Sequence, residues 1–190
     1  RASYALLGSG RAAVEVAAAS GLPLLAPEER HAGRTTSFGT GQLILDALDQ
    51  GCDSITLALG GSATNDCGTG ILRALGARFL SVEGEGLEGT GDELGRISRI
   101  DLSGLDERVG RTEFHVMCDV DNPLTGPDGA AAVYGPQKGA GPKDVARLDA
   151  GMHRYAAVIR DQLGIDVENV PGSGAAGGIG ACCVAFFGAT

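Results

Sequence analysis

Residues 54–70 have the sequence SITLALGGSATNDCGTG, and this stretch decides the fold class. Ser54 to Leu59 is a short apolar, β-prone run, which predicts a strand. A glycine-rich segment, Gly60 to Gly70, follows directly, and the apolar positions from Ile71 to Leu75 then predict a short helix. A strand, a glycine-rich loop and a helix in this order are typical of an α/β domain.

The sequence on either side extends this pattern. Apolar positions in Thr40 to Leu48 have helical spacing and predict a helix ahead of the strand. Glu113 to Cys118 is a candidate for a second buried strand. Asp144 to Leu163 repeats apolar residues at the spacing of a long amphipathic helix, with Gly164 as its stop signal.

Weaker patterns complete the prediction. Two apolar runs, Tyr4 to Leu7 and Ala12 to Ala17, predict a hairpin. Residues 77–82 predict a further strand, residues 83–95 an exposed loop, and residues 181–187 a helix that begins at a glycine-rich loop. We therefore expect a single α/β domain with a mixed sheet, flanking helices and glycine-rich loops.

Composition limits the classes of function. Hydrophobic residues make up 43% of the 190 residues and charged residues 21%, which is typical of a globular domain. The net charge of −9 disfavours nucleic acids and anionic membrane surfaces as partners. It does not exclude a small anionic ligand, because backbone dipoles can bind one inside an acidic protein. The 32 glycines have no collagen period and gather in loops, which indicates tight turns or close approach to a ligand.

The cysteines indicate a reducing, cytoplasmic setting. There are five, an odd number, and none forms a CxxC pair. This pattern argues against a disulfide framework and against a zinc site. No apolar run approaches the ~20 residues of a membrane span.

Gly60 to Asp66 is the first candidate for chemistry. A loop between a strand and a helix offers free backbone N–H groups and a helix dipole to an anion, and paired glycines let the backbone approach it. The segment matches neither the P-loop nor the Rossmann fingerprint. A tight turn whose polar residues only cap the helix explains it equally well.

Three further candidates have simple alternatives. Asp119 follows the strand that ends near Cys118, where a carboxylate could hold Mg²⁺ or accept a hydroxyl proton; the alternative is an Asx turn before Pro123. Lys138 lies among glycines and could reach a phosphate or carboxylate as a point charge; the alternative is a solvated surface turn. Gly172 to Gly180 could form a second anion site or simply allow close helix packing. His115 is better explained as a core histidine than as a base.

Taken together, these motifs resemble the class I glycerate kinase family. The matching strings are VEVAAASGL (14–22), RTTSFGTGQLI (34–44), LGGSATNDCGTG (59–70), CDVDNPLTGPDGA (118–130), YGPQKGA (134–140) and PGSGAAGGIGA (171–181). They span essentially the whole chain. Cys67 departs from the pattern, because the family commonly has glycine there.

The resemblance implies a function. Proteins of this family phosphorylate D-glycerate with ATP and Mg²⁺, usually to 2-phosphoglycerate, in a cleft between two α/β domains. Their chains are about twice as long as this one. The chain would then be the inserted middle domain, residues 1–190, without the partner domain on the nucleotide side, and inactive alone. A homodimer is one arrangement that the sequence leaves open.

The resemblance also implies roles for particular residues. Asp119 is the expected catalytic carboxylate, with Asp66 as the second choice, and Asp119 and Asp121 are the expected Mg²⁺ ligands. The expected contacts to glycerate and phosphate are Arg34, Ser37, Gly60, Gly61, Ser62, Thr64, Asn65, Asn122, Lys138, Gly174, Gly177 and Gly178. Two other hypotheses compete: a non-catalytic regulatory module that binds small anions, and a kinase for a related hydroxy acid.

Overall fold

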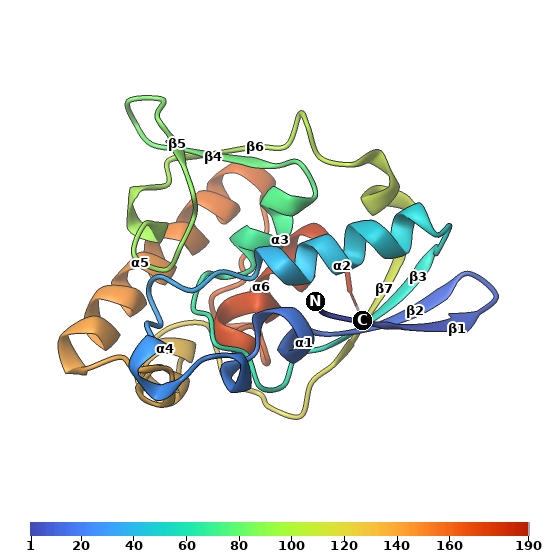
Figure 1. Cartoon of the computed structure of the whole chain (residues 1–190). Coiled ribbons are helices and arrows are strands. Elements are labelled where there is room, and N and C mark those ends of the chain that lie inside the picture. Colours follow the sequence, from blue (N-terminus) through green and yellow to red (C-terminus); the bar gives the residue numbers. More distant parts are fainter. Residues whose placement is uncertain (190) are drawn as a thin grey trace.

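Two sheets and six α-helices form the structure, a computed structural model that describes residues 1–189 (Figure 1). The strands are β1 (Ala5–Gly8), β2 (Arg11–Glu15), β3 (Ser54–Ala58), β4 (Arg78–Leu80), β5 (Gly86–Leu87), β6 (Arg99–Asp101) and β7 (Glu113–Met117). The helices are α1 (Val16–Ser20), α2 (Phe38–Asp49), α3 (Thr69–Ala74), α4 (Ala130–Tyr134), α5 (Pro142–Leu163) and α6 (Ala175–Phe186). This confirms the expected α/β class with a mixed sheet and flanking helices.

The larger sheet has the strand order β1-β2-β3-β7. β1 and β2 form the predicted antiparallel hairpin, while β2, β3 and β7 run parallel to one another. The second strand of the hairpin, β2, ends earlier than expected, because Val16 already begins α1. Ile55 pairs with Ala12 on one side and Phe114 on the other, and this row is buried beneath the helices. The sheet therefore packs one face into the core.

β7 is an edge strand, and this corrects two expectations. Phe114 is buried, but Met117 is 65% exposed. The side chain of His115 is 41% exposed, so it is not a core histidine. The apolar composition predicted burial on both faces, whereas only the face toward the helices is covered.

The smaller sheet, of order β5-β4-β6, corrects the prediction of an exposed loop over residues 83–95. β5 lies inside this segment, and Leu87 and Leu94 are buried. The glycines of the segment permit this packing, since a Cβ on Gly91 would lie 2.8 Å from the Asn65 carbonyl oxygen. The burial of these two leucines thus holds an otherwise polar segment against the core.

The C-terminal helices frame the loops that build the candidate site. α5 agrees with the predicted amphipathic helix and ends at Gly164, which has φ 72°. α6 begins six residues earlier than predicted, at Ala175 rather than Ala181, because Ala176, Gly177 and Gly178 turn with left-handed backbone angles before the regular helix. Within residues 1–189, no helix is long and apolar enough to cross a membrane.

Candidate active site

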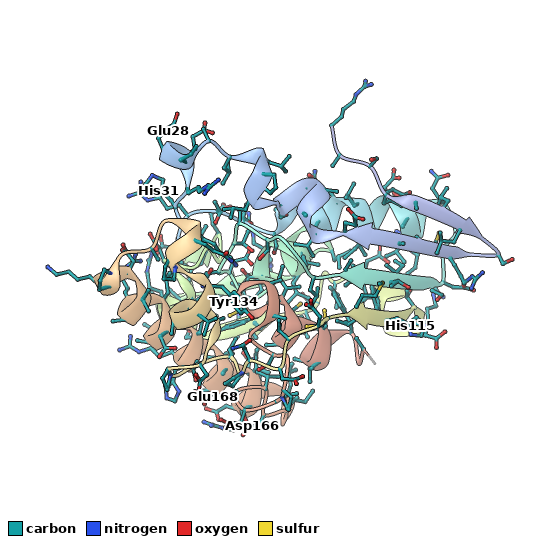
Figure 2. All side chains as sticks on the ribbon, turned by 90° about the horizontal axis from the view of Figure 1, so that it is seen from below. Glu28, His31, His115, Tyr134, Asp166 and Glu168 are labelled. Carbon is teal, nitrogen blue, oxygen red and sulfur yellow. The ribbon has the colours of Figure 1, made fainter. Side chains whose placement is uncertain are left out.

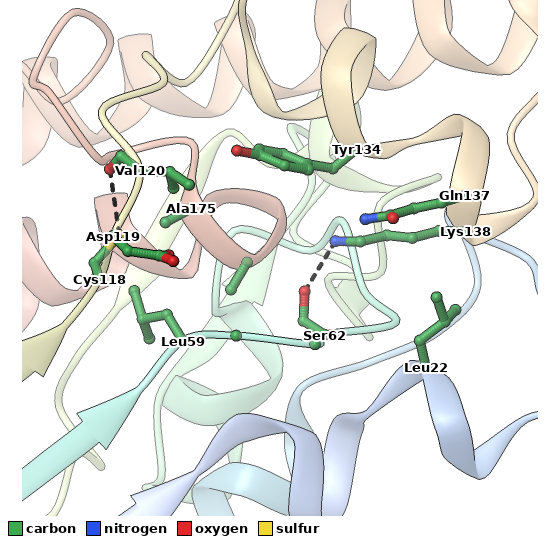
Figure 3. Close-up of a pocket in the computed structure, with 13 residues that line it drawn as sticks. Leu22, Leu59, Ser62, Cys118, Asp119, Val120, Tyr134, Gln137, Lys138 and Ala175 are labelled. Carbon is green, nitrogen blue, oxygen red and sulfur yellow. Dashed lines mark hydrogen bonds between the residues drawn. The ribbon is translucent and has the colours of Figure 1, made fainter.

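The candidate site is a cavity of about 300 Å³ where β3 and β7 end (Figure 3). These strands are parallel neighbours, so the loops after Ala58 and Met117 leave the sheet at the same edge. Ligands gather at this edge in open α/β sheets. The cavity is lined by Leu22, Leu59, Gly60, Gly61, Ser62, Cys118, Asp119, Val120, Tyr134, Gln137, Lys138, Ala175 and Ala176.

Asp119 presents its carboxylate to this cavity from the β7 side (Figure 3). The residue is exposed and makes no hydrogen bond or ion pair with any other residue that the structure describes. Asp121, the second expected metal ligand, lines a different cavity together with Cys183 and Gly172. The structure therefore separates the two carboxylates that the sequence suggested as a pair.

Lys138 faces Asp119 from the opposite wall (Figure 3). The side chain is buried, and its Nζ donates hydrogen bonds to Ser62 Oγ at 2.9 Å and to the Thr64 carbonyl oxygen at 2.6 Å. Burial lowers the pKa of Lys138 to about 7, although the nearby acidic groups of Asp66 and Cys67 oppose the shift. The alternative of a solvated surface lysine is therefore wrong.

The first glycine-rich loop supplies neutral donors to the cavity. The N–H groups of Gly60, Gly61 and Ser62 donate no hydrogen bond to any described residue, and all three residues line the cavity. Gly60 is open, with no atom within 4 Å of a Cβ built on it. The loop is held in place by Leu22, whose N–H donates to the Gly61 carbonyl oxygen at 2.8 Å. The anion site at this loop stays a prediction.

The later part of the loop faces the interior. Thr64 and Asn65 are buried and do not line the cavity. The carbonyl oxygen of Thr64 still takes part, because it accepts the hydrogen bond from Lys138. Thr64 and Asn65 thus shape the loop through their backbone, and their side chains do not make the contacts to a ligand that were expected.

Asp66 is also buried and outside the cavity. Its Oδ2 accepts hydrogen bonds from Ser37 N at 2.6 Å and Ser37 Oγ at 2.9 Å, and its Oδ1 accepts one from Gly68 N at 3.1 Å. Burial raises the pKa of Asp66, while these donors oppose the shift. Asp66 and Ser37 therefore link the loop to the start of α2, and neither reaches a ligand in this cavity.

Arg34 and Asn122 also lie away from the expected role. Arg34 is exposed, 4.0 Å from Asp92, and lines two smaller cavities instead. Asn122 accepts a hydrogen bond from Tyr134 OH at 2.6 Å and donates one to the Asp128 carbonyl oxygen at 2.8 Å. Its amide thus positions Tyr134, which lines the cavity. The sequence did not single out Tyr134 as a site residue, although Tyr134 precedes Lys138 in the YGPQKGA string.

The second glycine-rich loop packs against the first. A Cβ on Gly177 would lie 1.8 Å from the Thr64 carbonyl oxygen, one on Gly178 would lie 2.6 Å from Cys67 Sγ, and one on Gly174 would lie 2.1 Å from the Pro123 carbonyl oxygen. Only glycine permits this contact. The alternative of close packing is therefore correct for these glycines, while their neighbours Ala175 and Ala176 line the cavity.

The geometry defines an α/β protein with a cavity at its strand ends, in which a carboxylate faces a buried lysine, and the comparisons give the family. Residues 1–190 match the Glycerate kinase family over their whole length. The chain therefore belongs to the glycerate kinase family, as its motifs predicted.

Individual relatives agree. The chain is 48% identical to a glycerate kinase of Halalkalibacterium halodurans over 97% of this chain and 49% of the relative. It is 48% identical to the glycerate 2-kinase of Escherichia coli K12 over 99% of this chain and 50% of the relative. A crystal structure assigned as glycerate kinase 2 from Salmonella typhimurium LT2 superposes with a TM-score of 0.95 at 49% identity, over 98% of this chain and 50% of that one. The chain thus spans about half the length of the relatives it matches.

Proposed function

We propose that this chain is half of an ATP-dependent glycerate kinase, which transfers the γ-phosphoryl group of ATP to a hydroxyl of D-glycerate. The proposal is carried by the family match over residues 1–190, together with a cavity in which a carboxylate on one wall faces a lysine on the other. The similarity to a protein named glycerate 2-kinase supports 2-phosphoglycerate as the product. The reducing, cytoplasmic setting that the cysteines indicate is part of the same proposal.

Asp119 is the proposed base. Its exposed carboxylate would orient the acceptor hydroxyl of glycerate and take its proton as the oxygen attacks the γ-phosphorus. The bond between that phosphorus and the bridging oxygen of ADP breaks in the same transfer, and ADP leaves with the electron pair. A partner-free carboxylate suits this role better than Asp66, whose oxygens already accept hydrogen bonds from Ser37 and Gly68.

Lys138 and the first glycine-rich loop are proposed to stabilise the transferring charge. The ammonium group of Lys138 keeps a donor beyond its bonds to Ser62 and Thr64. The free N–H groups of Gly60 and Gly61 add dipoles that need no reorganisation during the reaction. An anion bound here would also raise the pKa of Lys138, because burial disfavours the ammonium form and a nearby negative charge favours it.

Mg²⁺ fits this half of the site only as a partner of the nucleotide. Residues 1–189 contain no group of three or more histidine, cysteine or acidic side chains that could hold a metal. Magnesium is commonly bound by one or two carboxylates together with substrate phosphates. Asp119 can provide one such carboxylate and Asp121 faces elsewhere. The ion would neutralise phosphate charge, and ATP would contribute its other ligands.

The remaining parts of the enzyme are proposed to lie in the other half of the full-length chain. The relatives are about twice as long as this chain. That half would complete the nucleotide site, so residues 1–190 alone should not turn over. A homodimer of full-length chains is compatible with this arrangement.

The test is glycerate-dependent ADP release by a chimera in which this chain replaces the matching half of the E. coli glycerate 2-kinase. Asp119→Asn should lower the rate by ~10² to 10⁴, with an unchanged melting temperature. Asp121→Asn is the matched control, because it removes the same charge two residues away on a different cavity. Equal activity of Asp119→Asn and the parent chimera would remove Asp119 from the role.

A panel of small hydroxy acids in the same assay separates glycerate from related acceptors. A chimera that binds these acids without ADP release, while the unmodified E. coli enzyme turns over, would favour the anion-binding module.

A further inference from the structure

Tyr134 brings a phenol ring to the candidate site, and the proposed function leaves this ring without a role. The residue ends α4 and is half-buried, and its hydroxyl points toward the side of the cavity on which Asp119 lies (Figure 3). Figure 2, seen from below, shows Tyr134 near the middle of the molecule, while Glu168 lies at its rim. The hydroxyl of Tyr134 therefore belongs to the cavity rather than to the outer surface.

The hydrogen bond between Tyr134 and Asn122 can run in only one direction. Asn122 Nδ2 donates to the Asp128 carbonyl oxygen at 2.8 Å. Because a carbonyl oxygen only accepts, the amide nitrogen must face Asp128, and the amide oxygen Oδ1 must face Tyr134. That oxygen cannot donate, so the Tyr134 hydroxyl gives its proton to Asn122 Oδ1, at 2.6 Å. The oxygen of Tyr134 can therefore accept a hydrogen bond from a ligand but cannot donate one.

The cavity thus has two chemically different sides. The Tyr134 oxygen and the Asp119 carboxylate, both acceptors, lie on one side, and Lys138 lies on the other (Figure 3). Burial raises the pKa of Tyr134, and the nearby acidic groups of Cys118 and Asp119 raise it further. The phenol therefore keeps its proton at neutral pH, and a ligand group beside its oxygen must be a hydrogen-bond donor.

We propose that the oxygen of Tyr134 accepts a hydrogen bond from the hydroxyl of glycerate that is not phosphorylated, which makes Tyr134 a specificity-determining residue for acids with hydroxyls on two adjacent carbons. This inference rests on the proposed function, in which Asp119 takes the proton of the other hydroxyl. Two acceptors on one side of the cavity match two neighbouring hydroxyl donors. Lys138 and the unpaired N–H groups of the first glycine-rich loop, which are donors, are left for the anionic groups.

This arrangement discriminates between hydroxy acids in two ways. An acid that lacks the second hydroxyl, such as D-lactate, leaves the Tyr134 oxygen without its donor, and a site built to bind a hydroxyl rejects the analogue that lacks it. An acid with a carboxylate in place of that hydroxyl, such as hydroxymalonate, sets acceptor against acceptor at Tyr134 and at Asp119. The structure therefore favours a neutral donor at this end of the ligand.

Tyr134→Phe in the full-length chimera tests the proposal, because it removes the oxygen and keeps the ring. We expect the KM for D-glycerate to rise roughly three- to tenfold. The kcat should stay within about twofold, since a hydroxyl that does not react is held equally in the ground state and the transition state. The inhibition constant of D-lactate as a competitive inhibitor should change by less than about twofold, because D-lactate has no hydroxyl to donate to Tyr134. Tyr155→Phe is the matched control: Tyr155 is buried outside the cavity, and its hydroxyl has no hydrogen-bond partner within residues 1–189.

Three outcomes would overturn the role of Tyr134. They are an unchanged KM for D-glycerate, a fall in kcat at unchanged KM, and an equal weakening of D-glycerate and D-lactate, which would mean that Tyr134 only shapes the cavity. The proposed function fails separately if the parent chimera binds D-glycerate without releasing ADP while the unmodified E. coli enzyme turns over. The dissociation constant of D-glycerate, measured by calorimetry, would then replace the KM, and Tyr134→Phe should raise it by the same factor.

Discussion

Gly177→Ala provides the sharpest test of how the two glycine-rich loops fit together. Gly177 has φ +70°, and a Cβ there would lie 1.8 Å from the Thr64 carbonyl oxygen. That same carbonyl oxygen accepts the hydrogen bond from Lys138. A methyl group at this position must therefore push Thr64 away and disturb the wall of the candidate site.

The expected loss in the free energy of unfolding on Gly177→Ala has two separate contributions. Alanine in the left-handed region costs about 1–2 kcal/mol, and overpacking against backbone that must shift adds about 1–3 kcal/mol. Gly164→Ala isolates the first cost, since Gly164 has φ +72° and no atom within 4 Å of a built Cβ. We expect Gly164→Ala to lose about 1 kcal/mol and Gly177→Ala about 2–5 kcal/mol in the free energy of unfolding.

Urea denaturation of the two variants and the parent, followed by circular dichroism, measures the difference. Both substitutions restrict the unfolded chain equally, so that contribution cancels in the comparison. If Gly177→Ala and Gly164→Ala lose the same stability, within about 0.5 kcal/mol, the contact between Gly177 and Thr64 does not constrain the fold.

Three further predictions concern the cavity and its support. Gly60→Ala should leave stability nearly unchanged, because no atom lies within 4 Å of its Cβ, while the added methyl raises the KM for a phosphorylated ligand in steady-state assays of the chimera. Asp66→Asn should lower the free energy of unfolding by about 3 kcal/mol or more, since its buried oxygens accept hydrogen bonds from Ser37 and Gly68; unchanged urea midpoints would contradict this. For Lys138, the folded-state pKa of about 7 is below that of an unfolded lysine, so the unfolded chain binds more protons between pH 7 and about 10.5. The stability of the parent should therefore rise with pH across this window by a few kcal/mol relative to Lys138→Met, and parallel pH profiles of the two proteins would refute the shift.

The sequence predicts those parts of the fold that depend on local pattern. The alternation and length of Ser54 to Leu59 and the helical spacing of Asp144 to Leu163 correspond to β3 and α5. Predictions failed where packing between distant segments decides. Leu87 is buried by a partner strand that lies earlier in the chain, and β7 is at an edge because no strand pairs with its outer side in residues 1–189.

The candidate site could be predicted as a set of loops but not as a set of facing side chains. Gly60, Asp119 and Lys138 were each identified from the motifs, and the structure brings them to one cavity. The inward turn of Asp66 could not be predicted, because it depends on Ser37, 29 residues away. A buried, hydrogen-bonded aspartate and an exposed one that faces a cavity have the same letter in the sequence, and only their partners in the structure distinguish them.

The placement of Lys138 bears on how an acidic chain could hold an anion, as the proposed function requires. The attraction of a permanently charged, exposed lysine for an anion would be weakened by the net charge of −9 and by salt. Lys138 is instead buried against Ser62 and the Thr64 carbonyl oxygen, where burial disfavours its charge and a bound anion would favour it. Binding of phosphate and protonation of Lys138 must therefore favour each other, because each lowers the cost of the other. Bound phosphate would thus increase the protonated fraction of Lys138.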